Sequence, residues 1–245
     1  TWIGSQLDQG DQGRLDVNQH IMAVYARPLT IYLRGSSWNR FGEADEVING
    51  FGRTGEMFAV EHWDVVPDIM TIAKGIISSY LPLAATVVKD EVADAFAGKE
   101  NYFRHVLTFS GHPVSAAASL KNIEIIQNEN MVENSRDVGA YFKEQLEGLA
   151  GDHPLIGDVR GRGLLMGVEL VSDREARAPV AEDVHIADKL NERFKKYGLI
   201  LRMSGNIINI GPPICITEGE VDEIIHALDV SLWEVEGEMG IAQMA

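Results

Sequence analysis

The chain has 245 residues, 45% of them hydrophobic, and its 37 acidic and 21 basic side chains give a formal net charge of −16. Such a charge repels phosphate backbones and anionic lipids, which argues against nucleic-acid and membrane-surface roles. No run of about 18 apolar residues is present, so no membrane-spanning helix is expected. Because no secretory signal is visible and Cys215 has no partner for an internal disulfide, we expect a cytoplasmic protein.

The composition of the chain changes at Asp45. Residues 1–44 are polar and irregular, except for an apolar stretch at 28–33 that we expect to be an edge strand. DEVINGFGRTG at 45–55 is rich in glycine and predicts turns. The next elements are expected to be strands within 68–75 and 82–90 and a short helix at 90–98 that Gly98 ends.

A long stretch with helical spacing follows at 113–148, and GDHP at 151–154 breaks it. We take this break as a domain boundary, which gives an N-terminal arm (1–44), a large domain (45–150) and a small C-terminal domain (151–245). Interleaved strands and helices predict an α/β unit followed by an α+β unit. In the C-terminal part we expect strands within 157–170, 199–204 and 207–211, and helices at 181–196 and 218–235.

Lys74 stands out because it lies in the apolar run DIMTIAKGI. Lysine is seldom buried without a partner. Asp45 precedes it by 29 residues, and Thr108 lies in LTFSGHP, a hydroxyl-rich turn before a predicted helix where free N–H groups favour a phosphate. Arg202 lies beside a turn, where its guanidinium can clamp a carboxylate.

A lysine, an aspartate and a phosphate seat together suggest pyridoxal phosphate. The amine forms a Schiff base with the aldehyde, and the aspartate keeps the pyridine nitrogen protonated so that the ring draws electrons from a substrate carbanion. Any one of these residues alone is weak evidence; a solvated lysine at a strand end is the more common finding.

Five stretches occur in the order found in class III aminotransferases, which are also called ω-aminotransferases. They are DEVINGFGRTG, PDIMTIAKG, LTFSGHP, GDVRGRGLLMGVEL and LRMSGNIINIGPPICIT. The resemblance covers 45–245. It implies the fold-type-I pyridoxal-phosphate architecture, here with a partial three-layer α/β/α large domain and a small α+β C-terminal domain.

The resemblance also implies roles for individual residues. Lys74 is expected to form the Schiff base and to move the proton between the substrate carbon and the cofactor. Asp45 is expected to pair with the pyridine nitrogen, and Val47 to pack on the ring. Thr108 is expected to reach the cofactor phosphate of a neighbouring subunit, which implies a homodimer, and Arg202 to accept a substrate carboxylate.

Each role has a simpler competitor. Asp45 is also a typical turn or cap residue, Val47 a core residue, Thr108 a helix cap and Arg202 a surface ion-pair partner. Four further residues are interpreted as structural, because hydrogen bonds, a helix start or acidic partners account for them: Arg53, His112, Arg160 and Arg162.

The chain departs from the family before Asp45. The preceding residues, GSSWNRFGEA, are too polar for the buried parallel strand expected there. The glycine/serine-rich phosphate segment and an aromatic–His–Gly segment are also missing, whereas 18–35 resembles the arm of the acetylornithine branch. The middle of the large domain is therefore expected to be absent, through an internal deletion, an artefact of gene prediction or a segment that was never built. Without that segment, apolar faces of the sheet would be exposed to water.

The leading hypothesis is pyridoxal-phosphate-dependent transfer of an amino group from an amine or amino acid to a keto acid such as pyruvate, in a ping-pong cycle. One alternative is an aminomutase of the same family. Another is a non-catalytic remnant that serves as a dimerisation module. A phosphate loop in NGFGRTG is disfavoured because it lacks the Gly-Lys-Ser/Thr ending. No metal site is expected.

Overall fold

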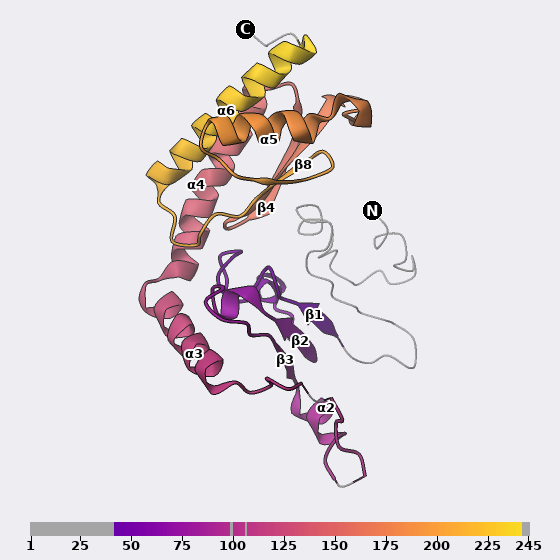
Figure 1. Ribbon diagram of the computed structural model, residues 1–245, viewed down its shortest axis with the longest axis vertical. Helices are drawn as coiled ribbons and strands as arrows, with labels where there is room; N and C mark the ends of the chain where they lie inside the picture. The colour runs from indigo at the N-terminus through magenta and orange to yellow at the C-terminus, as the bar shows by residue number, and fades with distance from the viewer. Residues whose placement is uncertain (1–41, 99, 106, 242–245) are drawn as a thin grey trace.

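The computed structural model describes residues 42–98, 100–105 and 107–241 (Figure 1). The expected N-terminal arm and its edge strand at 28–33 lie outside the described residues. The strands are β1 (Glu43–Asp45), β2 (Ile69–Ile72), β3 (Ala85–Val88), β4 (Ile156–Arg162), β5 (Leu165–Asp173), β6 (Ala178–Pro179), β7 (Arg202–Ser204) and β8 (Ile207–Ile210). The α-helices are α2 (Asp90–Asp94), α3 (Pro113–Asn128), α4 (Met131–Asp152), α5 (Ile186–Lys196) and α6 (Glu218–Met239), and short 3-10 helices are η2 (Ala59–Trp63), η3 (Lys74–Ile76) and η4 (Glu182–Val184).

The N-terminal unit is built on a small sheet of order β1-β2-β3 among the described residues, with β1 parallel and β3 antiparallel to β2. The prediction that GSSWNRFGEA supplies no buried parallel strand is wrong for its last two residues. A three-residue strand needs only one inward side chain, and Ala44 fills that place with no exposed surface. Gly42 N–H donates to Asp68 Oδ2 at 2.7 Å, which fixes the start of the pair.

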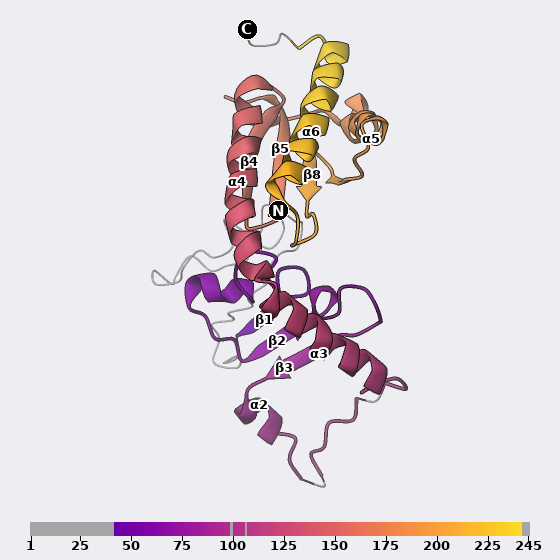
Figure 2. The ribbon, with the colours of Figure 1, turned by 90° about the vertical axis from the view of Figure 1, so that its left-hand side faces the viewer.

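The helical stretch at 113–148 forms two helices. His112 caps α3, because its Nδ1 accepts the Ser115 N–H at 3.3 Å, so its expected positional role is confirmed. Between the helices Asn130 takes a left-handed conformation (φ 52°), and α4 then leaves the N-terminal unit and runs along the C-terminal sheet (Figure 2). The break expected at 151–154 is confirmed by the end of α4 at Asp152. The domain boundary at 151 stays a prediction.

The C-terminal unit holds the largest core. Its antiparallel sheet has the order β4-β5-β8-β7, with β6 paired to β5. Helices α4, α5 and α6 pack with this sheet around fully buried side chains such as Phe142, Leu190 and Phe194. Phe142, Leu146 and Leu149 of α4 belong to this core, so the helix is part of the C-terminal unit in packing terms.

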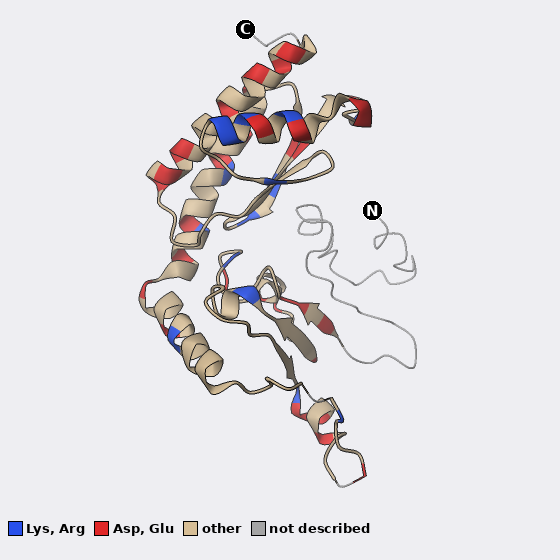
Figure 3. Cartoon of the chain, in the orientation of Figure 1, with Lys and Arg blue, Asp and Glu red and all other residues tan. Residues whose placement is uncertain are grey.

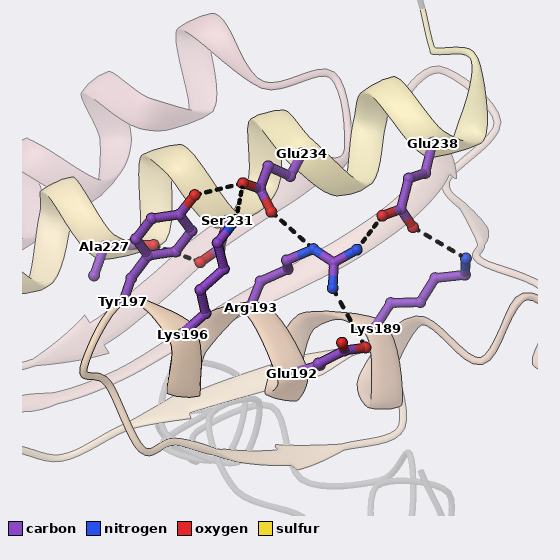
Figure 4. A network of polar contacts seen from close by, with 9 residues as sticks. All are labelled: Lys189, Glu192, Arg193, Lys196, Tyr197, Ala227, Ser231, Glu234 and Glu238. Atoms are coloured by element: carbon purple, nitrogen blue, oxygen red, sulfur yellow. Dashed lines mark hydrogen bonds and ion pairs between the residues drawn. The ribbon is translucent and has the colours of Figure 1, made fainter.

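Charge is concentrated on the C-terminal unit, where acidic residues recur along α6, while β2, β3 and most of α3 are uncharged and β1 has two acidic residues (Figure 3). Arg193 of α5 lies at the centre of an ionic network with α6 (Figure 4). Its Nε is 2.8 Å from Glu234 Oε2, and its Nη2 pairs with Glu238. Lys189 extends the same network at 3.3 Å from Glu238, and Lys196 extends it at 2.5 Å from Glu234.

A second ionic cluster is buried at the end of α4. His153 has no exposed surface, and its Nδ1 and Nε2 lie 2.8 and 2.9 Å from Glu236 and Asp229 of α6. Glu236 also accepts the Leu155 N–H at 3.1 Å, and Arg174 donates to the His153 carbonyl at 2.6 Å. This cluster therefore joins the end of α4, the start of β4 and α6.

No helix within the described ranges is long and apolar enough to cross a membrane.

Candidate functional site

Asp45 and Lys74 lie at the same edge of the small sheet. Strand β1 ends at Asp45, which stands opposite Thr71 of β2, and Lys74 follows two residues after β2 ends. Because β1 and β2 are parallel, their carboxyl ends meet at one edge, and the Glu46 N–H extends the pairing by donating to Thr71 O at 2.9 Å. Ligands of open parallel sheets bind at this kind of edge.

The loops that follow the two strands contact each other. A Cβ on Gly75 would lie 2.9 Å from Phe51 Cβ and 3.2 Å from the Gly50 carbonyl oxygen, so only glycine fits there without displacement. Asn122 of α3 donates to the Gly75 carbonyl at 2.9 Å from the other side. The turn that carries Lys74 is thereby fixed against the loop that begins at Asp45.

Lys74 itself is exposed and has a left-handed backbone (φ 47°), which is uncommon for a residue with a side chain. Such conformations cost on the order of 1–3 kcal/mol and cluster at functional sites. Among the described residues no hydrogen bond or ion pair engages its amine. The structure therefore presents a lysine amine at the strand edge rather than a lysine that neutralises a neighbouring carboxylate.

Asp45 is half-buried, and its Oδ1 accepts the Val47 N–H at 3.0 Å. This is the turn role considered as a competitor, and it leaves the second carboxylate oxygen for another partner. Val47 is half-buried and belongs to none of the hydrophobic clusters of the described residues, so its interpretation as a core residue is not supported.

Glu46 is a buried carboxyl group beside Asp45 that the sequence reasoning missed. It has no exposed surface, and it accepts the N–H groups of Ala59 at 3.1 Å and Val60 at 2.9 Å. Burial raises the pKa of Glu46 to about 7; the two N–H donors oppose this rise, and the negative charges of Glu61 and Asp45 add to it. The only sequence signal for the burial of Glu46 is strand alternation. Side chains two residues apart on an extended chain point to the same face, and Glu46 lies two residues after the buried Ala44.

Thr108 lies apart from these residues within the described chain. It is exposed, in a turn before α3, and His112 rather than Thr108 caps that helix, so the capping role is wrong. Asn122, which touches the Lys74 turn, is nine residues into α3, roughly 14 Å along its axis from Pro113. The described contacts do not bring Thr108 to Lys74.

Arg202 is exposed on β7 of the C-terminal unit, and its carbonyl accepts from Asn209 Nδ2 at 3.1 Å. Its guanidinium makes no ion pair with another described residue, so the surface ion-pair role is not supported there. The residue lines an open hollow of about 470 Å³ with Ile210, Pro212 and Ile224 among its walls.

The structural interpretations of three arginines have different outcomes. Arg53 holds its loop by hydrogen bonds as expected, and Arg160 pairs with Asp158 and Glu169 at 2.7 and 2.5 Å, also as expected. Arg162 contacts no acid within the described ranges. Its guanidinium lies 5.4 Å from the centre of a Trp63 ring instead, so an aromatic face replaces the expected carboxylate.

Known proteins similar to this chain include aminotransferases and ω-transaminases. An uncharacterized aminotransferase of Bacillus subtilis, YhxA, is 44% identical over 196 residues, which are 76% of this chain and 43% of the relative. The taurine–pyruvate aminotransferase of Bilophila wadsworthia is 40% identical over 208 residues, 80% of this chain and 45% of the relative. The ω-transaminase of Pseudomonas jessenii in complex with PMP is 36% identical, with a TM-score of 0.77, over 82% of this chain and 45% of that chain.

The chain thus spans less than half the length of these relatives. The family model described as "Aminotransferase class-III" matches residues 43–232, which begin at β1 and end within α6. The match includes both strand ends of the candidate site, the turn before α3 and the strand of Arg202. The chain belongs to the class-III aminotransferases.

Proposed function

We propose that the protein is a pyridoxal-phosphate-dependent aminotransferase that moves an amino group from an amine or amino acid to a keto acid such as pyruvate. The observation that carries this proposal is the meeting of Asp45 and Lys74 at adjacent ends of two parallel strands, with their following loops in contact. Family membership and the taurine–pyruvate relative support the same chemistry.

The residues at this edge fit pyridoxal phosphate. The amine of Lys74 is exposed and unpaired within the described chain, so it is available to hold the aldehyde carbon covalently. Asp45 keeps one carboxylate oxygen for the protonated pyridine nitrogen while the other holds the local turn. Val47, half-buried and outside the clusters, is available as a ring contact. When bound, the cofactor supplies an electron sink for the carbon that bears the amino group.

Each candidate site residue has a separate proposed role in this reaction. With the cofactor bound, Lys74 would be the base that carries the proton between the substrate carbon and the cofactor. Asp45 would hold the protonated pyridine nitrogen through the carboxylate oxygen that the turn leaves free. Arg202 binds the carboxylate of the keto acid through paired N–H donors. Thr108 is proposed to bind the cofactor phosphate of a second subunit, in line with its distance from Lys74 along α3. A homodimer and a cytoplasmic location stay predictions.

The test is an absorbance titration of the purified chain with pyridoxal phosphate, then borohydride reduction and peptide mapping. We expect a yellow species and a reduced adduct on the peptide that contains Lys74. Lys74→Ala should abolish both, whereas Lys121→Ala, which removes an exposed lysine paired with Glu124, should keep both. A colourless wild-type chain, or an adduct spread over several lysines, would refute the proposal and favour the non-catalytic dimerisation module.

An aminomutase remains the second candidate because it would use the same residues. It differs in keeping the amino group on one substrate. With a loaded chain, release of a separate keto product from the amino donor, in step with amination of pyruvate, would identify an aminotransferase. A rearranged amine without a free keto product would identify an aminomutase.

A further inference from the structure

Arg53 connects the loop after Asp45 to the C-terminal unit. Its Nη1 donates to the Leu164 carbonyl at 3.2 Å and also to the Pro212 carbonyl. Leu164 lies between β4 and β5, and Pro212 lies two residues after β8 ends. One guanidinium therefore joins the small sheet's loop to two separate segments of the other unit.

The backbone at this junction is packed closely. The Arg53 carbonyl accepts the Leu164 N–H at 3.0 Å and the Ser135 hydroxyl at 3.2 Å. A Cβ on Gly163 would lie only 2.4 Å from the carbonyl carbon of Thr54. The contact with Leu164 thus has backbone support, whereas the Arg53 guanidinium links this loop to Pro212.

Pro212 is close in the fold to the strand that carries Arg202. Arg202 pairs with Asn209 across β7 and β8, and Asn209 Nδ2 donates to the Arg202 carbonyl. Pro212 and Arg202 also line the same hollow. A shift of the segment at 211–213 therefore moves one wall of the space in front of Arg202.

We propose that Arg53 is a positioning residue that sets the placement of Arg202 relative to the Asp45–Lys74 edge. The expected effect on substrate binding rests on the proposed function, whereas the effect of Arg53 on the segment at 211–213 does not. A guanidinium serves this purpose because it is planar and presents several fixed donors to two carbonyls, whereas an ammonium is a single point of charge.

The test compares Arg53→Lys with Arg174→Lys in the full chain. Arg174 also donates to backbone carbonyls, those of Ile156, His153 and Ala150, but all of them lie around the end of α4 and the start of β4. It is therefore a matched loss of guanidinium contacts away from the junction. The first measurement is amide hydrogen exchange without cofactor. Arg53→Lys should speed exchange at 211–216 by about fivefold, the effect of losing roughly one hydrogen bond, and Arg174→Lys should leave that segment unchanged.

The second measurement uses the loaded chain with pyruvate as the carboxylate probe and 1-phenylethylamine as a probe without a carboxylate. Arg53→Lys should raise KM for pyruvate about fivefold while KM for the amine and kcat stay within about twofold. Equal rises for both probes would overturn the placement of Arg202 by Arg53, as would unchanged exchange at 211–216. A wild-type chain that forms no Lys74 adduct would refute the proposed function instead, and the exchange comparison would still decide the effect of Arg53 on that segment.

Discussion

Glu46→Gln tests whether the buried carboxyl group in the loop after β1 makes the stability of the folded chain depend on pH. The folded pKa of Glu46 is about 7 against an ordinary 4.5, mainly because burial disfavours the charge. The folded chain thus holds this proton more tightly than the unfolded chain. The stabilisation is fully present below pH 4.5 and is lost as the pH rises through about 7, and a shift of this size corresponds to about 3 kcal/mol.

Glutamine removes the titration but keeps the shape. Its carbonyl oxygen still accepts one of the two N–H groups of η2, while its NH2 group faces the other, at a constant cost of about 1–3 kcal/mol. Urea unfolding of both proteins should therefore show the variant less stable at pH 4.5, with the difference moving in its favour by about 3 kcal/mol up to pH 8.

Glu124→Gln is the control, because Glu124 is an exposed carboxylate paired with Lys121 at 2.7 Å and its charge is not among the causes of the raised Glu46 pKa. Its stability difference from the wild type should change little over the same range. A Glu46→Gln difference that is constant from pH 4.5 to 8 would refute the assignment of the buried carboxyl group.

Two further predictions concern the C-terminal unit. Burial lowers the pKa of His153, but hydrogen bonds to two carboxylates of α6 outweigh burial and raise it, so the stabilisation is complete below pH 6.5 and is lost as the pH rises through the folded pKa. His153→Gln should cost clearly more stability in urea at pH 5.5 than at pH 9, and an equal cost at both would contradict a charged ring. Gly163→Ala should lower the unfolding free energy by about 2–4 kcal/mol, because its Cβ would clash with Thr54. The control Gly205→Ala is also at positive φ (59°) but has no neighbour within 4 Å, so it should cost about 1 kcal/mol. Similar losses for both variants would show that the backbone at the junction moves to accommodate the Cβ.

Local patterns in the sequence predicted most elements, because each depends on neighbouring residues. The strands around Ile69–Ile72 and Ala85–Val88 and the helix at Asp90–Asp94 follow from apolar runs bounded by glycine and charge. Strand β1 was missed because one buried alanine is too short a signal. The break at Asn130 was missed, although asparagine adopts the left-handed backbone found there more readily than most residues.

The candidate site divides in the same way. Lys74 and Asp45 are marked by motif and spacing, and the parallel pairing of their strands places them at one edge. Glu46 was missed, and for Arg53 the sequence predicted hydrogen bonds but not their partners. The partners of Glu46 lie 13 and 14 residues away, and those of Arg53 lie 111 and 159 residues away. No periodicity in the sequence encodes such distances.

The two units differ in how completely they cover their apolar surface, and this bears on function. The C-terminal sheet and its helices enclose a continuous core, whereas every residue of β3 is exposed and Leu120 of α3 and Phe109 before it are 71% and 81% exposed. Surfaces of this kind are costly in water unless another chain or segment covers them. The candidate site at the Asp45–Lys74 edge lies on the less covered unit, where Asn122 links the Lys74 turn to α3 and Arg53 links the following loop to the C-terminal unit. Adduct formation at Lys74 in the isolated chain would show that these two contacts are enough to hold the edge in place.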